Sequence, residues 1–169
     1  MSFFKKLFHK EPKPEPIVII NELGSFTYSG GRSNLFEGMV EWCDNTIDVF
    51  LDPDDGETIT INTSLQILRK LLAQAQEWDQ KLKEYSAEDL LRGESDGLIH
   101  IWGSPEQLQD DVPPVTKEEY MERISLGFMH ISLNGDIYFD YSLDNMFTDH
   151  GMGIQANISG EIFSAGLQG

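Results

Sequence analysis

Four side chains near the C-terminus have the types and spacing that metal binding or acid–base chemistry requires. The segment DNMFTDHGMG (144–153) contains Asp144, Asp149 and His150, and Asp140 lies on the strand expected just before it. Carboxylate oxygens and an imidazole nitrogen could hold a divalent cation, and a histidine beside an aspartate could act as a general base. One hypothesis is therefore a metal-dependent hydrolase. The competing interpretation is structural, because a loop between two strands needs polar residues for its turns.

Other motifs for metal binding or catalysis are incomplete or absent. DPDDGE (52–57) is acidic like a calcium loop, but Gly56 is its fifth residue instead of the sixth, and Thr63 stands where an EF-hand has its last glutamate. Cys43 has no basic residue in its stretch that would lower the pKa of its thiol. Glycine-rich phosphate loops and serine-nucleophile motifs are absent from the sequence. We therefore expect no metal, no cofactor and no catalytic residue, and we favour a protein that is not an enzyme.

Short strands of alternating pattern would position these side chains. Two alternating runs flank Asn134-Gly135, a dipeptide typical of a tight hairpin turn, and predict strands on both sides of it. The same alternation in 36–43 and 46–51 predicts a second hairpin, with its turn at Asp44-Asn45. Further strands are expected at 98–103 and 153–162.

Two capping boxes predict where helices begin. Thr63-x-x-Gln66 precedes apolar residues that recur every three or four positions as far as Tyr85, which indicates one long helix with a break near Ser86. Thr116-x-x-Glu119 predicts a short second helix. The fold class is therefore α+β, with a mostly antiparallel sheet packed against one long and one short helix.

The first sixteen residues differ from the rest and form an amphipathic, proline-rich tail. On a helical wheel its apolar and basic residues separate, and those that could contact a membrane or a partner are Phe3, Phe4, Lys5, Lys6, Leu7 and Phe8. EPKPEP (11–16) reads as an extended polyproline spacer. The tail predicts either weak, reversible contact with anionic lipid or a disordered leader. Residues 17–169 would then form a single domain.

Charge and composition favour an interaction protein. The 169 residues carry a net charge of −17, which repels nucleic-acid phosphates and attracts a basic protein. A lone cysteine, no apolar run long enough for a membrane span and no signal peptide indicate the cytoplasm, with the inner face of the membrane as an alternative through the tail. The leading hypothesis is a non-enzymatic, immunity-type binder of a basic partner, and a membrane-peripheral accessory protein is a further alternative.

Several segments, taken in order, resemble the bacterial DUF2262 family, a family of unknown function. They are FEGMVEW (36–42), QEWDQKLKEYSAEDLL (76–91), VTKEEYMERISLGFMHISLNGDIYFDYS (115–142) and MFTDHGMGIQANISGEI (146–162). The resemblance covers roughly residues 22–169, and Asp149 stands where the family tends to have a glycine. It implies a fold and a bacterial origin. Because the family carries no established activity, it implies no catalytic residue.

Overall fold

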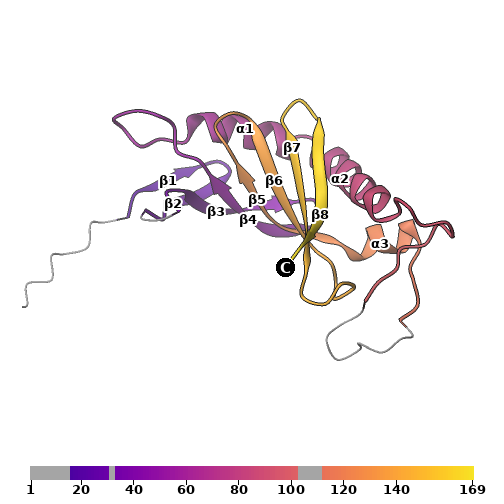
Figure 1. Cartoon of the computed structure of the whole chain (residues 1–169). Coiled ribbons are helices and arrows are strands. Elements are labelled where there is room, and N and C mark those ends of the chain that lie inside the picture. The colour runs from indigo at the N-terminus through magenta and orange to yellow at the C-terminus, as the bar shows by residue number, and fades with distance from the viewer. Residues whose placement is uncertain (1–15, 31–32, 103–111) are drawn as a thin grey trace, which may run out of the picture.

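The chain forms one eight-stranded sheet and three helices in a computed structural model that describes residues 16–30, 33–102 and 112–169 (Figure 1). Four strands come first: β1 (Val18–Asn21), β2 (Gly24–Tyr28), β3 (Phe36–Trp42) and β4 (Asn45–Leu51). The helices follow: α1 (Asn62–Leu72), α2 (Ala75–Leu90) and α3 (Lys117–Arg123). The last four strands are β5 (Ser125–Ile131), β6 (Asp136–Ser142), β7 (Gly151–Asn157) and β8 (Ile162–Gln168).

The strands lie in the sheet in their order along the chain. Every neighbouring pair is antiparallel except β4 and β5, which run parallel at the middle of the sheet. Parallel neighbours cannot be joined by a tight turn and need a long crossover. The crossover here contains all three helices, so the fold is two four-stranded meanders joined through a helical layer.

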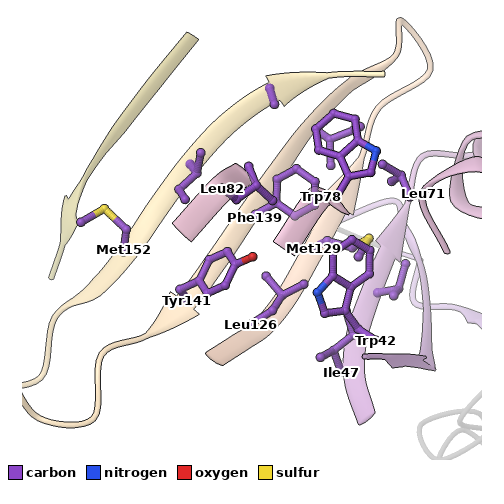
Figure 2. Close-up of a cluster of buried hydrophobic side chains, with 14 of the residues drawn as sticks. Trp42, Ile47, Leu71, Trp78, Leu82, Leu126, Met129, Phe139, Tyr141 and Met152 are labelled. Atoms are coloured by element: carbon purple, nitrogen blue, oxygen red, sulfur yellow. The ribbon is translucent and has the colours of Figure 1, made fainter. Parts of the chain in front are cut away.

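Alternation along each strand directs one set of side chains towards the helices. Trp42 of β3, Phe139 of β6 and Trp78 of α2 meet in the core, where the Trp78 ring stacks on Phe139 with 6.0 Å between ring centroids. Figure 2 shows these rings between the sheet and the helical layer, with Leu71 and Leu82 beside them. Of the three tryptophans in the sequence, Trp42 and Trp78 are buried, whereas Trp102 is 49% exposed.

The predicted hairpins are confirmed. β5 and β6 pair across Asn134-Gly135 with Ile131 opposite Ile137, and Gly135 has the positive φ of 89° that such a turn requires. β3 and β4 also pair, although their turn lies at Cys43-Asp44, one residue earlier than predicted. The prediction of a strand over 98–103 is wrong. The described residues of this segment form only an isolated bridge, between Ile99 and Val115.

The prediction of a single long helix is wrong. The structure has two helices there, α1 and α2, which are separated at Ala73-Gln74. Thr63 does not cap α1. The Asp54 carboxylate accepts hydrogen bonds from the backbone N–H groups of Asn62 at 2.6 Å and Thr63 at 3.0 Å instead. Ser86 is buried inside α2 and does not break it. The capping box of α3 is confirmed, with both reciprocal hydrogen bonds between Thr116 and Glu119 present.

Candidate binding face

The sheet has a second face, opposite α1 and α2, which no helix of the described residues covers (Figure 1). We call it the open face. The strand register places its side chains in rows that cross the sheet. One row runs through successive partners Glu37, Phe50, His130 and Tyr138, and the next through Met39, Asp48, Phe128 and Asp140. The two rows cross the parallel β4–β5 junction, so this surface combines both meanders.

Three aromatic rings form the centre of the open face. The centroids of Phe50 and Phe128 lie 5.6 Å apart with the rings perpendicular, and those of Phe128 and Tyr138 lie 5.8 Å apart with the rings tilted. All three side chains are half-buried by one another and keep part of their surface towards solvent. We call this group the aromatic platform. Edge-to-face contacts of this kind stabilise a fixed arrangement of rings.

Apolar side chains continue from the platform towards the β1 edge of the sheet. Met39 of β3 is 64% exposed, and Val18 and Ile20 of β1 are 45% and 78% exposed. Val18 pairs with Thr27, which pairs with Glu37, so Val18 and Ile20 point to the same side as the platform. Polar Ser25 and Thr27 of β2 lie next to these β1 residues, so the exposed apolar side chains alternate with polar ones across the face. Exposed apolar groups rimmed by polar residues are typical of sites that bind another macromolecule.

Carboxylates surround this apolar surface, and cations are missing from it. The eight strands contain five acidic residues, all on the open face, and no lysine or arginine: Glu37, Glu41, Asp48, Asp136 and Asp140. The chain has twelve basic residues in total, so their complete absence from the strands concentrates negative potential on this face.

Asp140 is half-buried, whereas the other four carboxyl groups of this set are exposed. Partial burial raises its pKa above the usual value, and a hydrogen bond of 3.3 Å from the Tyr138 hydroxyl opposes that shift. Burial and the nearby Asp140 charge also raise the pKa of Tyr138. Gly153 makes the arrangement possible, because a Cβ atom there would lie 2.6 Å from the Tyr138 hydroxyl oxygen.

A histidine–aspartate pair lies in the other row. His130 Nε2 is 2.8 Å from the Asp52 carboxylate, and the side chains are 33% and 29% exposed. Asp52 belongs to the DPDDGE segment, whose Asp54 caps α1. Within this acidic segment, Asp52 therefore contacts a strand histidine and Asp54 caps a helix.

Of the four predicted site residues, Asp149 and His150 lie side by side, with 3.7 Å between the Asp149 carboxylate and His150 Nδ1, whereas Asp144 and Asp140 have other surroundings. Asp144 pairs with Arg123 at 2.9 Å, and the side chain of Asp149 is 89% exposed. His150 Nδ1 is 2.9 Å from the Thr148 hydroxyl, while the ring of Trp102 contacts its imidazole edge to face. Asp140 lies on the open face. Within the described part of the chain these four do not form a three-ligand cluster.

The described residues contain one such cluster elsewhere, formed by Glu94, Asp96 and His100 between α2 and α3. All three side chains are exposed, and His100 Nε2 is 3.1 Å from Asp96 and 3.7 Å from Glu94. The backbone N–H of Leu98 donates to Asp96 and lowers the pKa of that carboxyl group. Hydrogen bonding within a surface loop accounts for this arrangement.

A polar network that the sequence interpretation missed joins the helical layer to the sheet. Asp79 of α2 accepts hydrogen bonds from the Trp42 indole at 3.2 Å and from the Tyr141 hydroxyl at 2.8 Å, and its other oxygen pairs with Lys83 at 3.0 Å. The one available signal was an aspartate within the apolar stripe of the helix. The groove beside it, between α2 and α3, has a volume of about 520 Å³ and lining side chains of both charges.

The membrane prediction for residues 3–8 concerns residues outside those that the structure describes. It therefore stays a prediction. Of the helices that are described, none combines the length and the apolar character needed to span a bilayer.

Fold and surface together define a mixed α/β protein with helices on one face of its sheet and an acidic, aromatic surface on the other. Residues 21–167 match the model of a family described as an uncharacterised protein conserved in bacteria, DUF2262, and the chain belongs to that family. Searches of curated proteins and of solved structures found no match.

Proposed function

We propose that this bacterial protein is a non-enzymatic interaction module that binds a basic protein partner through its open face. The observation that carries the proposal is the composition of that face: an aromatic centre, five carboxylates and no cation on any of the eight strands. Protein interfaces combine an aromatic core with a polar rim, and complementary charge speeds encounter.

The chemistry of the face also selects between classes of ligand. Its negative potential repels the phosphates of nucleic acids and attracts lysine and arginine side chains. Exposed apolar side chains occur from the β1 edge to Tyr138 of β6, and a macromolecular partner can cover a face of this width better than a small molecule can. A cytoplasmic, immunity-type protein that covers the basic active site of a toxin is the specific form of this proposal that we favour.

Charge reversal on each face separates this proposal from a general effect of net charge. The probe is a short peptide in which arginine alternates with threonine, and its binding is measured by fluorescence anisotropy. Two double variants change the net charge equally: Glu37→Lys with Asp48→Lys on the open face, and Glu84→Lys with Glu122→Lys on exposed positions of α2 and α3.

We expect the open-face variant to weaken binding about tenfold or more and the helix-layer variant to weaken it less than about twofold. Raising the salt concentration from about 50 mM to about 500 mM shortens the screening length and should weaken wild-type binding strongly. Equal losses in both variants would show that only net charge matters. Absence of salt-sensitive binding would refute the proposed function itself. Circular dichroism confirms that each variant is folded.

A further inference from the structure

The aromatic platform has a carboxylate on each side. Phe128 of β5 has Asp48 of β4 as its partner on one side and Asp140 of β6 on the other. Neighbouring strands lie about 4.8 Å apart, and paired residues point to the same side of a sheet. The Phe128 ring is therefore flanked along one row by two acidic side chains from different halves of the chain.

Neither flanking carboxylate is neutralised within the described residues. Asp48 and Asp140 take part in none of the ion pairs there, although Asp144 pairs with Arg123 and Asp79 pairs with Lys83. Asp140 is partly buried, and this desolvation disfavours its charged form. A cation placed beside it would restore the interactions that water no longer supplies.

Each of the three rings keeps part of its surface towards solvent, from where a cation can approach it. Phe50 meets Phe128 at an interplanar angle of 89°, and Phe128 meets Tyr138 at 42°, so the ring faces are not stacked on one another. A cation over an aromatic face is attracted by the ring quadrupole. Among protein cations, the planar guanidinium of arginine both stacks on a ring and directs N–H donors outwards from its edges, which the compact ammonium of lysine does not do.

We propose that the aromatic platform, with Asp48 and Asp140 on its flanks, is a recognition site for an arginine side chain of the basic partner. This inference rests on the proposed function and specifies its chemistry. The guanidinium lies on the platform and donates to the carboxylates beside it, while neighbouring apolar residues of the partner cover Met39 and the β1 edge. Recognition therefore depends on the type of cation as well as on its charge.

The test compares two peptides of equal length and charge, one with arginine alternating with threonine and one with lysine in place of each arginine. We expect wild-type protein to bind the arginine peptide about five- to tenfold more tightly. Phe128→Leu keeps an apolar side chain and should reduce this preference to less than about twofold, because the aromatic ring is lost. Asp48→Asn is nearly isosteric and exposed, and it should reduce the preference without affecting the fold.

Glu41→Gln is the matched control, because it removes one charge from the open face at an exposed position outside the two rows that contain the platform. It should weaken both peptides equally and leave their ratio unchanged. Equal, salt-sensitive binding of both peptides to wild type would overturn the arginine site and leave the proposed function standing. Salt-insensitive binding, or none, would overturn both.

Discussion

Removing the Asp79 carboxylate should destabilise the protein far more than a surface substitution would. Its Oδ1 atom accepts from Trp42, which is 1% exposed, and from Tyr141, which is fully buried. Asp79→Ala leaves both donors without their acceptor and removes the ion pair of Lys83 at 3.0 Å. The two hydrogen bonds connect α2 to β3 and β6, whereas the ion pair lies within α2, so the loss of the hydrogen bonds affects the attachment of the helical layer.

The size of the effect follows from the burial of each group. A hydrogen bond to a charged acceptor contributes about 1.5–3 kcal/mol, and an unsatisfied buried donor costs about 1–3 kcal/mol. The Asp79 side chain is 17% exposed and borders a groove, so water replaces part of what is lost. We therefore expect Asp79→Ala to lower the free energy of unfolding by about 3 kcal/mol. Tyr141→Phe removes one donor and should cost about 1 kcal/mol.

Urea denaturation followed by tryptophan fluorescence and by circular dichroism measures both values. A double-mutant cycle isolates the contact, since Tyr141→Phe should cost little once Asp79 is gone. We expect a coupling energy of about 1 kcal/mol or more between the two sites. An Asp79→Ala cost below about 1 kcal/mol, together with no measurable coupling, would refute the reasoning that this carboxylate attaches α2 to the sheet.

Three further predictions concern the core, the open face and the buried phenols. Gly38→Ala would place a Cβ atom 2.5 Å from Phe26 Cδ1, and overpacking of this kind should lower the free energy of unfolding by about 1–3 kcal/mol in urea denaturation. The raised pKa of Asp140 means that folding disfavours the charged form of its carboxyl group. Wild type should therefore lose stability relative to Asp140→Asn as pH rises from the usual aspartate range through that raised pKa. Equal stability profiles against pH for the two proteins would contradict this. Burial raises the pKa of Tyr120 to about 12 and that of Tyr141 well above its usual value. Phenolate absorbance should therefore show phenols that ionise at higher pH than free tyrosine, and Tyr120→Phe and Tyr141→Phe should each reduce that absorbance. Stability should fall as pH rises above about 10, because the unfolded chain releases these protons more readily.

Local patterns predicted the local parts of this fold. Alternation around Asn134-Gly135 identified both strands of the hairpin and separated Phe128 and His130 from the core residues between them, because a period of two directly reflects which face a side chain occupies. β8 (Ile162–Gln168) was missed, since glycine, alanine and serine give it little alternation. The α1–α2 break was missed because the apolar stripe continues across Ala73-Gln74 without a proline or glycine there.

Distant pairings could not be predicted from the sequence in the same way. The parallel register of β4 on β5 joins Phe50 to His130 across eighty residues, and no local pattern specifies it. The same holds for the His130–Asp52 pair and for the Asp79–Tyr141 hydrogen bond. The candidate site depends on this register, because β4, β5 and β6 each supply one member of the aromatic platform.

The parallel junction also explains why the open face exists. Parallel neighbouring strands cannot be joined by a tight turn, so the connection from β4 to β5 must cross one face of the sheet. Here that connection places α1 and α2 on the crossed face. Both meanders can bury apolar side chains under that layer, and neither supplies a second layer for the opposite side. On that opposite side, solubility alone would favour mixed charges, whereas the strands carry aromatic rings with carboxylates and no cation. The proposed basic partner would supply the missing cations and would account for both features at once.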